Sequence, residues 1–577
     1  MPRLSLLAAC AMLAALAACA SPSGSGQPTA SADVGPAAPV VDGHASPLGL
    51  YLAGQAALNE GKGDVAASYF AQAANEDSDA GFLKDSAFQA ALIAGDVRRA
   101  AQLAPATGEG SAGAVELGQL TRAVEDLAEN RGRDAQALLA SHPLTSPLDV
   151  ADKLLLPWAA AAAGDWRTAL AAPDTGGDHL VGQIALLDQA LLLENRHEID
   201  EADQAFHKLL SISDGAGLYT AAYGEFLQRH GRTPDAIKLF QSGLKAEPSN
   251  ALLQDALASA QAGHPPPRAP TLQQGAANAL LPPAAFLLAE KQPELGLDYL
   301  RLVLRLDPKR DEAWLLIGDT LSAGGQVDDA RAAYAAPQPG SSAYVAARTR
   351  LIATYDDSPK DAPTELGLAE ETAKAAPTDP DALELLADAL RINAHYQESA
   401  QVLDKLIVQL GPQASWSLYY MRGVALDQAD DWPGAERDLK QALAMSPDEP
   451  DVLNYLGYSW IDRGVDLKDA KAMIEKAVAA KPDSGAIVDS LGWADYKLGL
   501  YTDAVEQLER ATELEPADPD INNHLGDAYW AVGRKLEARF QWEQVLSLEP
   551  SDKLRAEVEA KLKSGPDSGP RSAIAEK

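Results

Sequence analysis

Residues 450–482, PDVLNYLGYSWIDRGVDLKDAKAMIEKAVAAKP, contain the pattern that decides the fold. Similar stretches lie on both sides, and a proline closes each one: Pro447, Pro482, Pro516 and Pro550. Successive prolines in this series are 35, 34 and 34 residues apart. A glycine lies 24 to 25 residues before each proline: Gly423, Gly457, Gly492 and Gly526. A repeat of fixed length with helical spacing inside it predicts similar units that stack on one another.

The repeat resembles the tetratricopeptide repeat (TPR), a helix-turn-helix unit whose copies form a superhelical solenoid. Small residues such as Gly457 and Ala470 would let two helix axes approach closely. Large apolar residues such as Leu456, spaced at i, i+3, i+4 and i+7, would fill the seam between the helices. The closing proline would end the second helix, because its ring fixes φ and its nitrogen carries no hydrogen. We therefore predict an all-α TPR solenoid of roughly 12 to 14 helix pairs.

Composition agrees with helices alone, since no stretch shows the sustained alternation of apolar and polar residues that predicts strands. Looser copies of the repeat occupy residues 47–80, residues 217–250 and the segment that begins at Asp311. The Pro-rich segment 263–271 is interpreted as a joint between two solenoid halves or as a long loop between ordinary repeats. The predicted parts are an N-terminal solenoid (47–262), the joint (263–271), a middle solenoid (272–413), a regular array with a capping helix (414–563) and a disordered tail (564–577).

The first residues predict export and lipid attachment. Arg3 precedes an apolar run from Leu4 to Ala18, which is too short to span a bilayer and has the length of a signal-peptide core. The run ends in Leu16-Ala-Ala-Cys19, which resembles a bacterial lipobox, so residues 1–18 are predicted to be a signal peptide and Cys19 to carry lipid. The alternative is an ordinary secretory signal with an incidental cysteine.

The residue after Cys19 and the segment that follows it indicate where the protein would lie. The residue after Cys19 is Ala20. An aspartate at this position would retain a lipoprotein at the inner membrane, so the expected location is the outer membrane, facing the periplasm. Residues 19–46 form a predicted flexible tether rich in Ser, Gly and Pro, with a reach on the order of 30 Å. Two or more acyl chains on Cys19 would make a stable anchor.

Charge and motifs limit the classes of function. The chain has 83 acidic and 48 basic residues, a formal net charge of −35, which argues against nucleic acid as a partner. The excess of acidic residues has two interpretations: it keeps a large exposed surface soluble, or it attracts a basic protein partner. Gly108-Glu-Gly-Ser-Ala-Gly113 matches a dinucleotide-binding pattern, but it lacks the surrounding strand–helix–strand unit. No histidine spacing fits a metal site, so we predict no enzyme activity, catalytic residue, metal or cofactor.

One face of the regular repeats carries side chains that packing does not require. At positions five, nine and twelve of each first helix, aromatic residues alternate with Asn and Asp, as in a groove that binds peptides. The predicted partner-binding residues are Tyr420, Asn454, Tyr458, Asp489, Trp493, Tyr496, Asn523, Asp527 and Trp530. The alternative is that these aromatics pack on the neighbouring repeat. The nine positions lack Lys and Arg, so they are not expected to clamp a C-terminal carboxylate.

Five runs of residues within 416–550 carry a closer resemblance: WSLYYMRG (416–423), LNYLGYSW (453–460), VDSLGW (488–493), NHLGDAYW (523–530) and ARFQW (538–542). They resemble the proteobacterial LbcA-like family of TPR outer-membrane lipoproteins. The resemblance is looser over 272–415 and only architectural before that. It implies an adaptor that binds a periplasmic carboxyl-terminal processing protease and presents murein hydrolases to it.

Two other functions stay open at this point. The first is a structural lipoprotein of a polysaccharide-export or secretion complex. The second is an enzyme acting on the cell wall, located in the degenerate N-terminal half.

Overall fold

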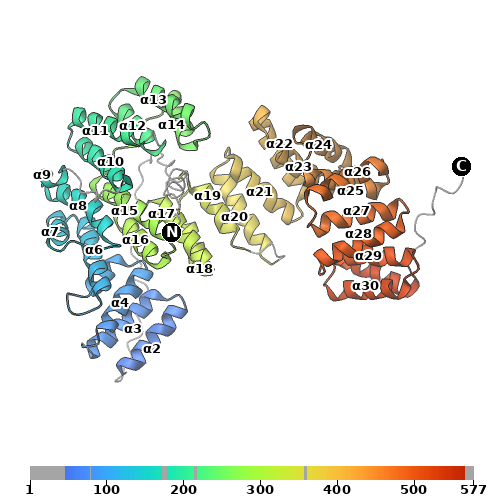
Figure 1. Cartoon of the computed structure of the whole chain (residues 1–577), viewed down its shortest axis with the longest axis horizontal. Coiled ribbons are helices and arrows are strands. Elements are labelled where there is room, and N and C mark those ends of the chain that lie inside the picture. Colours follow the sequence, from blue (N-terminus) through green and yellow to red (C-terminus); the bar gives the residue numbers. More distant parts are fainter. Residues whose placement is uncertain (1–45, 78, 172–178, 214–216, 356–359, 566–577) are drawn as a thin grey trace. The chain divides into compact units, whose positions relative to one another are not determined.

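The computed structural model describes residues 46–77, 79–171, 179–213, 217–355 and 360–565. These residues form 30 α-helices and one short 3-10 helix, with no strand among them (Figure 1). The predicted fold class, an all-α TPR solenoid, is confirmed. The 30 α-helices exceed the roughly 24 to 28 that 12 to 14 helix pairs would contain, and the shortest of them is α9 (Trp166–Ala169). The predicted signal peptide, Cys19, nearly all of the tether and residues 566–577 of the tail lie outside the described residues.

The chain divides into two compact units, Met1–Asp356 and Asp357–Lys577. The other described helices of the first unit are α2 (Pro47–Asn59), α3 (Gly63–Glu76), α4 (Gly81–Ile93), α5 (Val97–Leu103), α6 (Ala112–Ala128), α7 (Gly132–Ser141), α8 (Asp149–Ala163), α10 (His179–Asn195), α11 (Ile199–Ile212), α12 (Gly217–Arg229), α13 (Thr233–Ala246), α14 (Ala251–Ala262), α15 (Leu272–Ala289), α16 (Pro293–Leu306), α17 (Asp311–Ala323), α18 (Val327–Ala335) and α19 (Tyr344–Ile352).

The helices of the second unit are α20 (Ala362–Ala375), α21 (Pro380–Ile392), α22 (Tyr396–Leu410), the 3-10 helix η1 (Gly411–Gln413), α23 (Trp416–Gln428), α24 (Trp432–Met445), α25 (Pro450–Arg463), α26 (Leu467–Ala480), α27 (Gly485–Lys497), α28 (Tyr501–Leu514), α29 (Pro519–Ala531), α30 (Lys535–Ser547) and α31 (Asp552–Ser564). Each closing proline lies just beyond the end of a second helix, as predicted; Pro516, for example, follows the last residue of α28 by two.

Within the first unit, helices that are distant in sequence pack together. Helix α15 lies against α8, and α16 lies against α6 and α4 (Figure 1). Gly275 of α15 allows the first contact, because a Cβ there would lie 2.1 Å from the ring of the buried Trp158. Arg305 Nε of α16 donates to Glu125 Oε2 of α6 over 2.7 Å. The Pro-rich segment 263–271 lies within the first unit.

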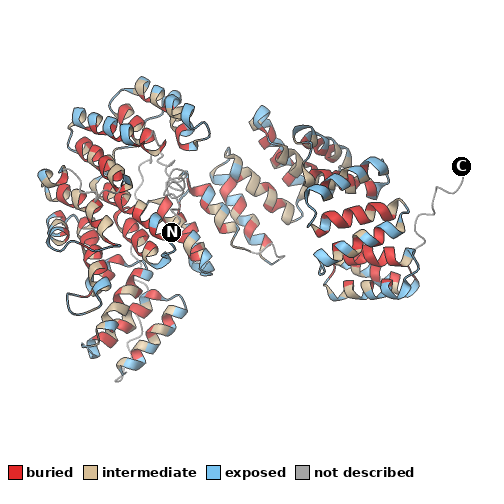
Figure 2. Ribbon diagram, viewed as in Figure 1, coloured by how far each residue is buried: buried red, intermediate tan, exposed pale blue. Residues whose placement is uncertain are grey.

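The second unit keeps the regular packing that the period predicts. Each first helix packs on its second helix, as α29 does on α30. Gly526 permits this contact, since a Cβ on it would lie 2.4 Å from Trp542 Nε1. The second helix α28 buries one face and exposes the other, whereas the first helices α27 and α29 are buried on nearly all sides (Figure 2). The predicted capping helix is present as α31, which packs on α30 and covers the last repeat.

Candidate partner-binding surface of the second unit

The nine predicted groove residues lie on the first helices of four successive repeats: α23, α25, α27 and α29. Helix α27 contacts both α25 and α29, so corresponding positions of these helices are neighbours in space. Side-chain contacts run from one repeat to the next: His524 of α29 pairs with Asp489 of α27, and Tyr455 of α25 contacts Tyr420 of α23. The structure thus brings positions that are about 34 residues apart in sequence onto one ladder of side chains.

The centre of the ladder is a stack of rings beside a buried ion pair. His524 Nδ1 donates to Asp489 Oδ2 at 2.9 Å, and both side chains are buried. Trp493 stacks on His524 with ring centroids 4.1 Å apart, and on Tyr496 at 4.9 Å. Tyr496 is buried too, and burial raises its pKa to about 12. The carboxylate of Asp489 and the ring of Tyr496 therefore make their contacts inside the protein.

The neighbours of the His524 imidazole favour its charged form. Burial by itself would lower the pKa of His524, but the charge of Asp489 and its hydrogen bond outweigh burial, so the pKa is raised. The hydrogen bond between His524 and Asp489 links helix α29 to helix α27 of the preceding repeat. His524 was not among the predicted residues. It follows Asn523 in sequence and is not at one of the repeat positions expected to face the groove.

The C-terminal end of the ladder is covered by α31. Lys561 Nζ donates to Asp527 Oδ2 at 2.8 Å and to Asn523 Oδ1 at 2.9 Å. Trp530 contacts Trp542 at 5.4 Å, and a Cβ on Gly565 would lie 2.6 Å from its ring. The predicted groove residues Asn523, Asp527 and Trp530 thus contact the capping helix. This differs from the open position expected for them, because α31 has no counterpart in the repeat pattern.

An open section of the ladder remains, formed by the partly buried residues Tyr420, Asn454, Tyr458 and Trp493. Two buried polar atoms in it have no hydrogen-bond partner within the protein: the acceptor Asn454 Oδ1 and the donor Trp493 Nε1. Burial raises the pKa of Tyr458, and the nearby carboxylates of Asp489, Asp462 and Asp520 raise it further. The open section therefore combines aromatic surface, one free donor, one free acceptor and negative charge.

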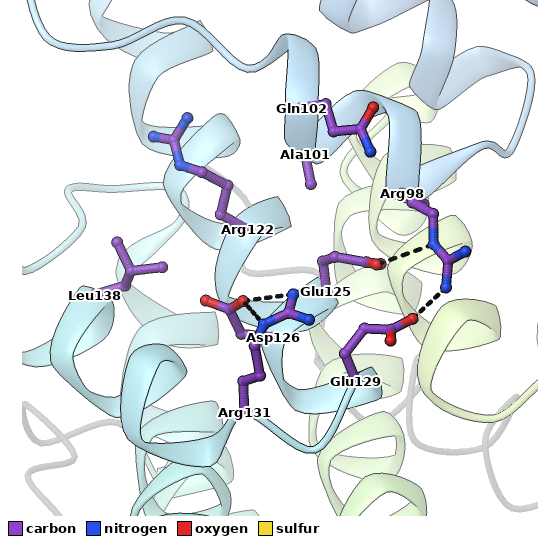
Figure 3. A pocket seen from close by; sticks show the side chains of 9 residues that line it. All are labelled: Arg98, Ala101, Gln102, Arg122, Glu125, Asp126, Glu129, Arg131 and Leu138. Atoms are coloured by element: carbon purple, nitrogen blue, oxygen red, sulfur yellow. Dashed lines mark hydrogen bonds and ion pairs between the residues drawn. The ribbon is translucent and has the colours of Figure 1, made fainter.

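The first unit has a hollow of about 530 Å³ between α5, α6 and α7 (Figure 3). Its charges are already paired: Arg98 contacts Glu125 and Glu129, and Arg131 contacts Asp126 at 2.8 Å. Arg122 Nη1 donates to the Ala104 carbonyl, and burial lowers the pKa of this arginine. With its acids and bases matched in this way, the hollow carries no excess charge for a ligand.

Two further observations concern the described residues alone. Within them, no group of three or more His, Cys, Asp and Glu side chains is placed to hold a metal ion. None of the helices in this part of the chain has the length and apolar character to cross a bilayer.

Two family models match the second unit. The model "Tetratricopeptide repeat" matches residues 420–485, and the model "TPR repeat" matches residues 492–533. Both matches fall on the repeats that carry the ladder. Together with the observed helix pairs, they establish a TPR protein, a fold whose usual role is that of a scaffold for protein–protein interaction.

Solved TPR structures resemble the chain at low identity. The "APC/C hetero-tetramer Cut9-Hcn1" chain is 14% identical, with 91% of this chain and 97% of that chain covered and a TM-score of 0.38. Yeast Tom70 is 14% identical over 90% and 95% of the two chains, with a TM-score of 0.29. A thermophilic TPR protein of Thermus thermophilus is 20% identical over 32% and 100%, also at 0.29. Comparison with the curated proteins gave no match.

Proposed function

We propose that this TPR protein is a non-catalytic scaffold, held at the outer membrane by lipid on Cys19, that binds a periplasmic protein through the open section of its ladder. The observation that carries the binding role is the pair of unsatisfied atoms, Asn454 Oδ1 and Trp493 Nε1, among partly buried aromatic rings. A buried polar atom without a partner costs free energy, so such atoms are rare unless something else bonds to them.

The chemistry of the open section fits a segment of polypeptide. A peptide backbone offers N–H groups that match the acceptor Asn454 Oδ1 and carbonyl groups that match the donor Trp493 Nε1; both atoms are buried here, so binding would include a shift of the side chains that cover them. Tyr420 and Tyr458 offer flat apolar faces for the side chains between these bonds. Helices α23, α25 and α27 present these groups from a rigid scaffold, so little conformational entropy is lost on binding.

The partner and the location rest on the resemblance and on the lipobox. The LbcA-like family binds a periplasmic carboxyl-terminal processing protease, and by that resemblance the partner is such a protease, with murein hydrolases as its substrates. The lipobox at Leu16–Cys19 places the anchor, and Ala20 favours the outer membrane. A Cys19→Ser protein is therefore expected to leave the outer-membrane fraction of a sucrose gradient and to lose its acyl mass.

The binding role is tested by variants that remove one polar atom and little else. Asn454→Leu removes the free acceptor, and Trp493→Phe removes the free N–H while keeping a ring on His524 and Tyr496. Together they are expected to lower the affinity for the captured protease at least about tenfold. Asn454→Leu should leave the thermal midpoint unchanged or raise it, whereas Trp493→Phe should lower it slightly, because the smaller ring loses part of its packing on His524 and Tyr496.

Val408→Ala serves as the matched control, because Val408 is exposed on α22 and lies outside the ladder. It should leave capture unchanged. If the Asn454→Leu, Trp493→Phe protein captures as much protease as the unmodified protein, the ladder is not the binding surface. Recovery of export machinery in place of a protease would remove the adaptor role.

A further inference from the structure

The first and the last described helices of the chain differ in chemistry. At the C-terminal end, α31 covers the last repeat with a face that bears Lys553, Glu559 and Lys563. At the other end, α2 has no charged residue along its whole length. Terminal units of a solenoid normally present a polar outer face, because no further repeat covers them. The first described helix departs from this rule.

The uncovered face of α2 is apolar over two turns. Leu48 is 66% exposed and Leu52 is 58% exposed, and the exposed Ala56 continues the same line at i+4 spacing. Phe82, at the start of α4, is 58% exposed. Its ring meets the edge of Tyr51, the neighbour of Leu52, at a centroid distance of 5.6 Å. We call Leu48, Leu52, Ala56 and Phe82 the α2 patch.

The position of the α2 patch in the chain indicates what covers it. The first described residue, Ser46, caps α2 by accepting a hydrogen bond from the Gly49 N–H at 3.1 Å. Cys19, the proposed lipid attachment point, precedes it by 27 residues. A chain of that length and composition reaches on the order of 30 Å, so the anchor holds α2 close to the bilayer.

The charge of the chain points to the same occupant. A formal net charge of −35 makes most of the surface unfavourable next to anionic lipid, but α2 adds no charge to its own end. A helix with leucines on its outer face and an aromatic ring beside them has the character of an element that lies in the membrane interface. The anchored end is therefore the end that can approach lipid.

We propose that the α2 patch docks on the lipid surface beside the anchor, and so fixes the orientation of the first unit at the membrane. This inference rests on the proposed lipid attachment at Cys19. Docking adds a second, weak contact to the anchor; by itself the patch is too small to hold the protein on a membrane. The partner class is a lipid surface and not another protein.

The test uses the full-length lipidated protein on vesicles of phosphatidylethanolamine and phosphatidylglycerol. An Ala56→Cys variant is labelled with an environment-sensitive fluorophore, since the two native cysteines, Cys10 and Cys19, are removed and acylated in the proposed mature form. Lipids with a nitroxide on the acyl chain are expected to quench this label several-fold more than a label on Phe286→Cys, which is 38% exposed on α15 of the same unit. Adding Leu48→Asp and Leu52→Asp should abolish the difference while the anchor keeps the protein on the vesicles.

Equal quenching at the two labelled positions would overturn the proposal. So would a blue-shifted emission of the Ala56→Cys label without vesicles. If that shift grows with protein concentration, a second copy covers the patch; if it does not, another segment of the chain does. Mass spectrometry of Cys19 separates this result from the proposed function: if no acyl chain is present, the anchor is refuted, and the same label is read with the unanchored chain added to the vesicles.

Discussion

Gly526 and Trp542 illustrate how single residues set the distance between two helices. The largest buried side chain of the last repeat, Trp542, lies directly against Gly526, which has no side chain. Gly224 with Phe240 and Gly318 with Tyr334 repeat this pairing in the first unit, at 2.0 Å and 2.3 Å from an added Cβ. The period in the sequence therefore reflects a steric requirement, because a large apolar side chain from the second helix fills the space that the glycine leaves, as Leu508 does at Gly492.

Gly526→Ala is expected to destabilise the second unit by about 1 to 3 kcal/mol, because the new methyl group overlaps the indole of Trp542. Gly367→Ala, in α20 of the same unit, is the matched control. An added Cβ at Gly367 meets nothing within 4 Å, so this change should stabilise by about 0.5 to 1 kcal/mol. Urea unfolding of the full chain measures both, and equal effects of the two substitutions would refute the steric explanation.

A buried acid predicts how the stability of the first unit depends on pH. Burial raises the pKa of Asp298 to about 7, although a hydrogen bond from Gln89 Nε2 at 2.9 Å opposes the rise. In the folded state Asp298 keeps a proton between about pH 4 and pH 7 that the unfolded chain has lost. Its stabilising contribution is thus complete below about pH 4 and lost by about pH 7, a change on the order of 4 kcal/mol.

Asp298→Asn removes this titration while it keeps an oxygen for Gln89. Urea unfolding at about pH 5 and about pH 8 should show a smaller difference for the variant than for the unmodified protein. An unchanged difference would mean that Asp298 is ionised in the folded state across this range.

At the scale of elements, α31 shows how a capping helix can occupy a surface that the repeat pattern leaves open. Its Lys561 lies where a further repeat would meet Asn523 and Asp527, and it satisfies both. Trp542 Nε1 also donates to Asp527 Oδ1 at 3.2 Å. The carboxylate of Asp527 is therefore bonded from two elements, α30 and α31, and its charge depends on Lys561 for compensation.

Lys561→Met is expected to destabilise the second unit by about 3 kcal/mol, because it leaves the buried carboxylate of Asp527 without its cation. Hydrogen exchange should rise in α31 and at the end of α29, and stay unchanged in α23. Adding Asp527→Asn should recover part of the loss, since it removes the uncompensated charge. If the double variant is less stable than Lys561→Met alone, the ion pair is not the source of the effect.

The elements themselves could be predicted from the sequence, since the helix pairs, the closing prolines and the capping helix all leave a periodic or terminal signal. The accessibility of individual ladder residues could not. Asp489 is buried by His524, and Asn523 by Lys561, and neither partner belongs to the repeat consensus. The packing of α15 on α8 could not be predicted for a related reason, since these helices are far apart in sequence and no repeat relates them.

On the scale of the whole molecule, the chain consists of two units, each with its own buried core. The unit boundary near Asp356 has no compositional signal as strong as the Pro-rich segment 263–271, which lies within a unit. Contacts such as that between Arg305 and Glu125 join helices on the two sides of this segment. They follow no repeat in the sequence and could not be predicted from it.

The division predicts two calorimetric transitions. Because each unit has a separate core, Gly526→Ala should lower the midpoint of one transition and leave the other unchanged. Asp298→Asn should move the other transition at about pH 8. A single transition that both substitutions shift together would show that the two units unfold as one.

The proposed binding face of the scaffold can be tested in living cells with a photo-crosslinking amino acid. Placed at Tyr458, in the open section of the ladder, the crosslinker is expected to form one discrete adduct that mass spectrometry identifies as a periplasmic processing protease. Placed at Val408, which is exposed on the same unit but outside the ladder, it should form none. An adduct with this protease from Val408 and none from Tyr458 would contradict the proposal that the ladder binds the partner.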